Sequence, residues 1–202
     1  MFATAAEKRH HDYPGGLLQH TASMVRLASA MDGIYQDIDM ELLICGCALH
    51  DIGKIYELTM PTAGTSRYTL QGSLLGHLYL GTREVEKAYE ELGRPMDEDA
   101  LQLLHIVASH HGKLQFGALT PPAFKEAYIV HTLDMMDSRM QMFEKDYESL
   151  NEGELMESGK KFDDDRVRIY HPVRETAKGA VLPSKNKEAE PSTVRPPWEI
   201  EE

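Results

Sequence analysis

Cysteines are scarce in this sequence. Its 202 residues include two, Cys45 and Cys47. They lie two positions apart in an apolar stretch with helical spacing, so they point to different faces of a helix and cannot easily form a disulfide. So little cysteine, with no sign of a disulfide framework, is typical of a reduced, cytoplasmic protein.

Basic residues are also few. Lysine and arginine number 21 against 33 aspartates and glutamates, which gives a formal net charge of −12. Because non-specific affinity for nucleic acid comes mostly from basic side chains that neutralise phosphates, this balance argues against duplex DNA as a partner. The chain also lacks a run of roughly 18 apolar residues and the layout of a signal peptide, so we expect no membrane partner. No feature of the sequence indicates an oligomeric state.

The composition predicts one domain followed by a tail. With 42% hydrophobic residues, the chain is long enough for a single compact unit with a core. We place this unit at residues 1–150 and assign residues 151–202, which hold five of the ten prolines, to a polar, largely irregular and partly disordered tail. Within that tail, alternating residues at 166–170 favour a short strand.

Apolar residues at helical spacing predict five helices in the domain. They are expected at about 16–31, 39–50, 72–92, 97–112 and 123–149. Asp39 is the predicted N-cap of the second helix, and Gly46 within it would let a neighbouring helix approach closely. Residues 57–71 contain proline, glycine and an alternating stretch that predict a loop or short β-hairpin. The expected fold is therefore an all-α helical bundle with this loop or hairpin.

The second helix delivers a histidine and an aspartate side by side, His50 and Asp51, just before Gly53 and Lys54. An imidazole nitrogen and a carboxylate oxygen suit a divalent first-row transition metal. Other predicted helices add candidate ligands, of which His20 lies on an apolar stripe and should face inward. The full candidate set is His20, His50, Asp51, His77, His110, His111 and Asp134.

Each of these residues also has a simpler interpretation. A single histidine on a helix is more often a hydrogen-bonded core or surface residue than a ligand, and we favour that interpretation for His105 and His131, which stay second choices as ligands. His10, His11 and His171 lie in polar surroundings and are expected to be solvated. A carboxylate in an apolar stretch, such as Asp134, instead indicates a counter-ion, because burying it alone is costly.

The order of these residues resembles the H…HD…D pattern of the HD-domain superfamily of metal-dependent phosphohydrolases. More narrowly, residues 13–21 (YPGGLLQHT), 48–54 (ALHDIGK), 76–77 (GH) and 109–112 (SHHG) are similar to the HD domain of YhaM-type 3′-to-5′ exoribonucleases. The resemblance covers about residues 1–145 and implies an HD-domain bundle. It also implies that His20, His50, Asp51 and Asp134 hold a first metal. His77 and His110, with Asp51 bridging, would hold a second, and His111 would be a further ligand or a phosphate contact.

That exonuclease family carries an OB-fold module before the HD domain, and this chain begins where such a module would end. An OB-fold supplies the basic groove that holds single strands. Two expectations follow. Either this is a stand-alone HD protein that acts on smaller phosphoesters, or Met1 marks a boundary after an OB-fold.

The resemblance implies hydrolysis by a hydroxide on one or two divalent ions, with Mn, Fe, Co and Ni all compatible. The substrate would be a nucleotide or the 3′ end of short single-stranded RNA. Asp51, Lys54 and His111 are the expected catalytic residues, and Lys54, Arg67 and His111 the expected substrate contacts. Lys54 is equally compatible with a plain cation at a helix end. Tyr68 is a further candidate contact.

Besides a phosphohydrolase, two other functions are compatible with the same pattern of histidines and aspartates. A similar constellation of histidine and aspartate on helices also houses a di-iron oxygenase, which needs iron and O₂. The third possibility is a regulatory or binding module in which the metal site is structural. The complete ligand set argues against that module.

Overall fold

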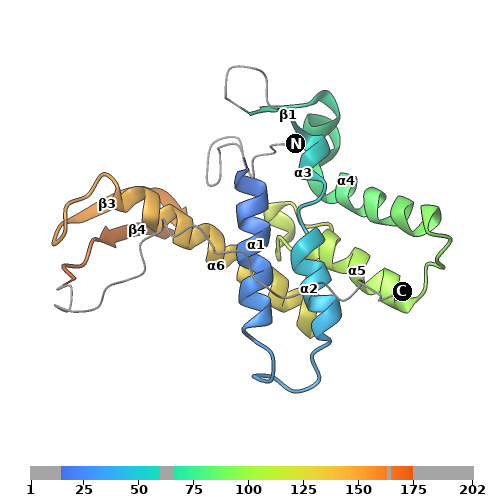
Figure 1. The fold of residues 1–202 in the computed structure, drawn as a ribbon. Coiled ribbons are helices and arrows are strands. Elements are labelled where there is room, and N and C mark those ends of the chain that lie inside the picture. Colours follow the sequence, from blue (N-terminus) through green and yellow to red (C-terminus); the bar gives the residue numbers. More distant parts are fainter. Residues whose placement is uncertain (1–14, 60–65, 163–164, 175–202) are drawn as a thin grey trace, which may run out of the picture.

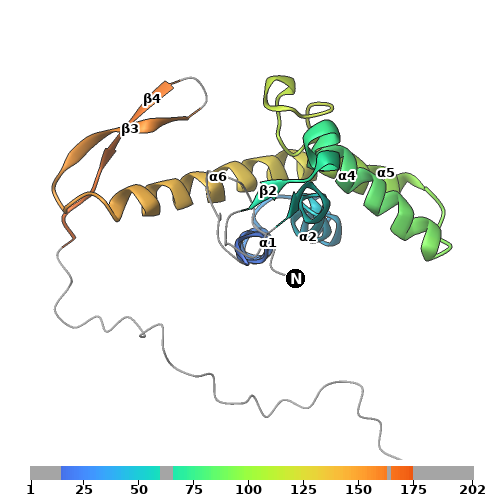
Figure 2. The ribbon, with the colours of Figure 1, turned by 90° about the horizontal axis from the view of Figure 1, so that it is seen from above.

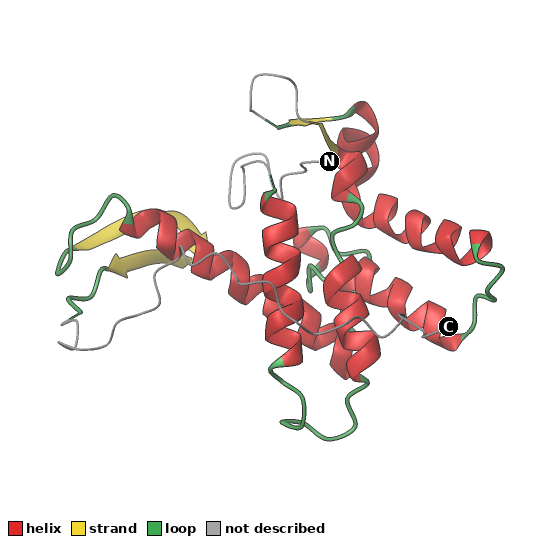
Figure 3. Cartoon of the chain, viewed as in Figure 1, coloured by secondary structure: helices red, strands yellow, loops and turns green. Residues whose placement is uncertain are grey.

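The computed structural model describes residues 15–59, 66–162 and 165–174. Five long helices form its bundle (Figures 1 and 3), and all five were predicted from the sequence. They are α1 (Gly16–Ser29), α2 (Met40–Leu49), α4 (Leu70–Glu91), α5 (Glu98–Ser109) and α6 (Lys125–Tyr147). Two short elements, α3 (Lys54–Glu57) and the 3₁₀ turn η1 (Leu114–Phe116), lie between them.

Local signals fix where the helices begin. The Asp39 side chain accepts a hydrogen bond from the Leu42 amide at 2.9 Å, as expected of an N-cap. Asp97 caps α5 in the same way through the Ala100 amide. Thr69 caps α4 through the Gly72 amide at 2.8 Å, and the helix begins at Leu70, two residues before its predicted start.

The main apolar core lies where α1, α2, α5 and α6 meet. Its fully buried members are Met24, Ala28, Leu43, Cys47, Ile106, Ala127 and Val130. The predicted close approach at Gly46 is confirmed, because a Cβ there would lie 3.0 Å from Ile106 and 3.3 Å from Val130. A smaller cluster around Val107 joins α4 to α5.

Of the loop or short hairpin predicted after the second helix, the structure has the hairpin, with β1 (Leu58–Thr59) paired antiparallel with β2 (Arg67–Tyr68). Helix α4 then begins almost at once. It is not continuous, since Gly76 has φ 72° and ψ 158° and breaks the helix just before His77. Glycine adopts this left-handed region of φ without the steric cost that a Cβ would impose.

The C-terminal half of α6 extends away from the bundle, and a second hairpin lies beside its end (Figures 1 and 2). Its strands are β3 (Leu155–Phe162) and β4 (Asp165–Tyr170). The strand at 166–170 was predicted, whereas β3 was not, so part of the expected irregular tail is regular. Ile169 is buried in this region. None of the helices in the described part of the chain is both long and apolar enough to cross a membrane.

His171 was expected to be solvated, and this prediction was wrong. Its Nδ1 lies 2.7 Å from the Leu150 carbonyl oxygen, and its ring stacks on Tyr147 with centroids 4.4 Å apart. The hairpin returns the chain to the end of α6, a tertiary contact that local polarity does not indicate. His10 and His11, together with residues after 174, lie outside the described residues.

Candidate metal centre

The seven candidate ligands predicted from five helices come together in one cluster. His20 lies within α1, His77 follows the break in α4, and Asp134 lies on α6. His50 and His110 are the C-caps of α2 and α5, so two helices end at the same place. Five of the cluster's members, His20, His50, Asp51, His77 and His110, are at most 8% exposed.

Asp51 lies at the middle of the cluster. Its Oδ1 is 3.5 Å from Nε2 of both His77 and His110. Its Oδ2 is 3.4 Å from Nε2 of His50 and 3.8 Å from Nε2 of His20. Each oxygen of the Asp51 carboxylate therefore faces one pair of imidazoles. This is the geometry that a bridging ligand requires.

All five clustered imidazoles are held through Nδ1. Each Nδ1 lies 2.7 to 3.1 Å from an oxygen atom. The partners are Asp137 for His20, Cys47 O for His50, Glu57 for His77, Val107 O for His110 and Phe116 O for His111. Because carbonyls and ionised carboxylates only accept, each Nδ1 carries a hydrogen, and in the neutral ring Nε2 is left as an acceptor.

These Nε2 nitrogens face one another. Nε2 of His77 and Nε2 of His111 are 3.1 Å apart, and so are Nε2 of His20 and Nε2 of His50, where a proton on His20 can lie between the two nitrogens. Nε2 of His110 and Oδ1 of Asp51 are buried and have no hydrogen-bond partner in the described structure. Lone pairs brought so close repel one another unless positive charge lies between them. The donor set of imidazole nitrogens and carboxylate oxygens fits a divalent transition metal.

Three groups of donor atoms lie within 4.8 Å of one another. They are His20, His50 and Asp51; His50, His110 and Asp134; and His77, His110 and His111. We call the first group, with Asp134, the inner end of the cluster and the third group the outer end. His111 is less buried than the other imidazoles, which puts the outer end nearer to solvent.

The two ends differ in how readily they take up a proton. At the inner end, burial lowers the pKa of His20, but hydrogen bonds to Asp134 and Asp137 outweigh this and raise it to about 9. At the outer end, burial lowers the pKa of His110 to about 3 and also lowers that of His111. A proton on His20 can therefore supply positive charge at the inner end, whereas His110 and His111 at the outer end take up a proton less readily.

The carboxylates of the cluster stay ionised. Burial opposes this for Asp51, but the Lys54 ammonium and His50 hold its pKa well below the usual range. Burial likewise opposes ionisation of Asp134, and the hydrogen bond from His20 lowers its pKa nonetheless. Lys54 Nζ lies 2.7 Å from Asp51 Oδ2, and this partner raises the lysine's pKa against the effect of burial. The Lys54 ammonium therefore forms an ion pair with the central carboxylate, that of Asp51.

Sequence reasoning missed two residues of the cluster, Glu57 and Asp137. Asp137 Oδ2 lies 2.7 Å from Nδ1 of His20, and Glu57 Oε1 lies 3.1 Å from Nδ1 of His77. Asp137 had a detectable signal, since it lies three residues after Asp134 and hence on the same face of the helix. Glu57 had none, because it ends a helix of four residues whose periodicity is too short to show a face.

The remaining predicted residues are not among the clustered ligands. Arg67 and Tyr68 are exposed on β2, and their contact with substrate stays a prediction. His105 and His131 have hydrogen-bonded roles, as their simpler interpretation predicts. His105 Nε2 accepts from the Ala123 amide at 3.0 Å, and His131 Nδ1 lies 2.8 Å from the His110 carbonyl oxygen.

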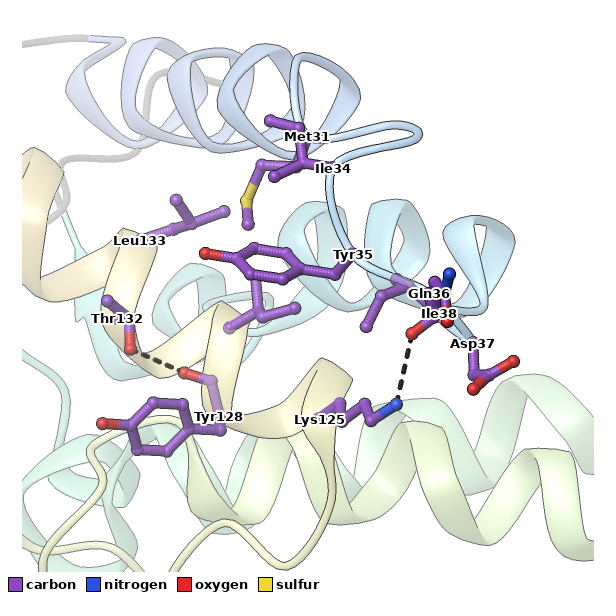
Figure 4. A pocket seen from close by; sticks show the side chains of 11 residues that line it. Met31, Ile34, Tyr35, Gln36, Asp37, Ile38, Lys125, Tyr128, Thr132 and Leu133 are labelled. Carbon is purple, nitrogen blue, oxygen red and sulfur yellow. Dashed lines mark hydrogen bonds between the residues drawn. The ribbon is translucent and has the colours of Figure 1, made fainter.

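A separate apolar pocket of about 710 Å³ lies between the end of α1, the loop that follows it and the first half of α6 (Figure 4). Tyr35 and Tyr128 line it, and Lys125 Nζ donates to the Gln36 carbonyl oxygen at 3.2 Å at its edge. None of the clustered histidines or aspartates is among its lining residues. The polar cluster and this pocket are therefore distinct features.

Comparisons with known proteins agree with the resemblance seen in the sequence. The profile of the HD domain matches residues 17–139. The 3′-5′ exoribonuclease YhaM of Bacillus subtilis strain 168 is 42% identical over 153 residues, which are 76% of this chain and 48% of that protein. The 3′-5′ exoribonuclease YhaM of Listeria welshimeri is 39% identical over 171 residues, which are 85% of this chain and 53% of the Listeria protein. The chain spans about half the length of the curated relatives it matches. No solved structure gives a significant match.

Proposed function

Because this chain belongs to the HD-domain family, we propose that it is a metal-dependent phosphohydrolase that cleaves a phosphoester in a nucleotide or at the 3′ end of short single-stranded RNA. The observation that carries the proposal is the set of buried acceptors that face one another around Asp51 Oδ1. The RNA substrate rests on the relatives, which are named 3′-5′ exoribonucleases. The acidic charge of the chain, −12, agrees with a short strand end rather than a duplex.

In this proposal the two ends of the cluster hold one ion each. His20, His50, Asp51 and Asp134 would bind the first, and His77 and His110 would bind the second with Asp51 shared. Bound divalent ions supply Lewis acidity that lowers the pKa of water and neutralises charge on phosphate oxygens. Manganese, iron, cobalt and nickel all suit these donors.

The chain's own groups then have distinct tasks. The Lys54 ammonium, on Asp51 Oδ2 at 2.7 Å, keeps the carboxylate ionised and offers a point charge to a phosphate oxygen. His111, the most exposed imidazole of the cluster, is placed to contact the phosphate or to complete the outer end. Arg67, which is exposed on β2, would be a further contact for the substrate.

Metal analysis coupled to a hydrolysis screen tests this function. The purified protein, loaded with Mn²⁺ under anaerobic conditions, is assayed on a generic phosphodiester, nucleoside phosphates and short single-stranded RNA. We expect turnover without O₂, and its loss to background in Asp51→Ala with the helical circular dichroism retained. Full activity of Asp51→Ala would refute the proposal. Activity that requires iron and O₂ would favour an oxygenase instead.

A further inference from the structure

Two of the five clustered imidazoles are held by carboxylates, and the other three are held by backbone carbonyls. Asp137 holds His20 at the inner end, and Glu57 holds His77 at the outer end. Both carboxylates are buried, with 7% of Asp137 and 6% of Glu57 exposed. Each end of the cluster therefore contains one histidine whose imidazole N–H points at a negative charge shielded from water.

The backbone around His77 is built to make this contact. Because Gly76 leaves the helical region, the His77 amide is free of the helix ladder and donates to Glu57 Oε1 at 3.0 Å, while Nδ1 lies 3.1 Å from the same oxygen. Gly72 lets the first turn of α4 rest on the Glu57 backbone, since a Cβ there would lie 2.3 Å from Glu57 O. One carboxylate oxygen thus fixes both the main chain and the ring of His77.

A carboxylate behind an imidazole ligand acts on the atom at the far side of the ring. It fixes the ring's orientation and increases the basicity of Nε2, which strengthens the bond from Nε2 to a cation. A backbone carbonyl orients the ring in the same way but carries no net charge. Loss of the charge with retention of shape should therefore weaken cation binding at one end of the cluster and leave the other end unchanged.

We propose that Glu57 and Asp137 are positioning residues that set the metal affinities of the two ends separately, Glu57 through His77 at the outer end and Asp137 through His20 at the inner end. This inference rests on the metal binding of the proposed function. Neither residue touches substrate in this scheme. Their effect is read in cation affinity, independently of turnover.

The test titrates the metal-free protein with Co²⁺ and follows heat and visible absorption, which reports the ligands around each ion. We compare wild type with Glu57→Gln and Asp137→Asn, whose amide oxygens can still accept from Nδ1. Each variant should weaken one binding step by about 10- to 100-fold and leave the other step as in wild type, and the two variants should affect different steps.

Glu126→Gln is the matched control, because Glu126 is also a buried carboxylate and accepts the Asp39 amide at 2.8 Å outside the cluster. It should leave both steps unchanged. If Glu57→Gln does not fold, Gly76→Ala tests the same end, since it keeps the carboxylate but disfavours the break that frees the His77 amide. It should weaken the same step.

The inference is overturned if both amide variants bind Co²⁺ as wild type does and only lower the unfolding midpoint of the metal-free protein. It is also overturned if both weaken the same step, or if Glu126→Gln weakens binding as much. Failure of wild type itself to bind Co²⁺ would instead overturn the proposed function, so the two failures are distinguishable.

Discussion

The polar cluster lies one turn from the apolar core on the helices that the two regions share, and α4 adds His77 to the cluster. His20 lies one turn from Met24 on α1, and His110 one turn from Ile106 on α5. Asp134 lies one turn from Val130 on α6. The apolar core is stable without a bound ligand, because apolar side chains need no specific partner. The cluster differs, since it buries Nε2 of His110 and Oδ1 of Asp51 without a hydrogen-bond partner in the described structure. The same scaffold thus holds one region that stabilises the fold alone and one whose buried acceptors fit a bound cation.

The largest expected effect comes from the core. Leu43→Ala, at a fully buried position, should lower the free energy of unfolding by about 2–5 kcal/mol, through lost burial and the cavity left behind. Urea denaturation with and without metal measures it, and the loss should be the same in both conditions. Leu101→Ala, at an exposed position on α5, is the control and should change stability little. A loss that depends on metal would break the distinction between the two regions.

Metal removal should act on the cluster alone. A divalent ion that binds only the folded state, at 1,000 times its dissociation constant, adds about 4 kcal/mol to the free energy of unfolding. Chelation should therefore lower the unfolding midpoint of wild type, and it should lower that of His50→Ala less, because only the outer end keeps all its ligands in that variant. Mg²⁺, which prefers oxygen ligands, should replace Mn²⁺ poorly in this assay. Equal midpoints for wild type with and without chelator would contradict the interpretation of the cluster.

A smaller effect should appear with pH in the metal-free protein. Since folding raises the pKa of His20 from 6.5 to about 9, its protonated form stabilises the fold fully below pH 6.5, and this contribution is lost as the pH rises to 9. At about 1.4 kcal/mol per pKa unit, the total is at most about 3.5 kcal/mol.

Denaturation midpoints between pH 6 and 9 measure this effect. His20→Asn should flatten the profile, and bound metal should flatten it in wild type, because the ion replaces the proton. A slope that persists in His20→Asn would assign the dependence to another group.

The smallest perturbation is thiol labelling, which leaves the fold intact. Cys47 lies in the core one turn from His50, and burial raises its pKa to about 12, whereas Cys45 is exposed. One thiol per chain should therefore react at pH 8 in the native protein and two in denaturant. Cys45→Ser should abolish the native reaction. Fast labelling of Cys47 in the native state would show that the core opens beside the cluster.

Much of the cluster could be predicted from the sequence because its residues interrupt apolar patterns. His20 lies on an inward stripe, and His50 and Asp51 end an apolar helix before a glycine, so both signals are local. Glu57 and Asp137 were not assigned, because their role depends on which histidine they face. Glu57 meets His77 across twenty positions and Asp137 meets His20 across 117, and helical periodicity carries no information about such pairs.

The sequence by itself determined the five helices, the interruption after the doublet, as a loop or a hairpin, and the types of ligand. These follow from periodicity, caps and side-chain chemistry, which act over a few residues. Only the tertiary structure decided which atoms face which: that Nδ1 of every clustered histidine is held from outside, and that Nε2 atoms converge on Asp51. That arrangement depends on two helices ending at one point and on the break at Gly76, and packing between distant segments fixes both.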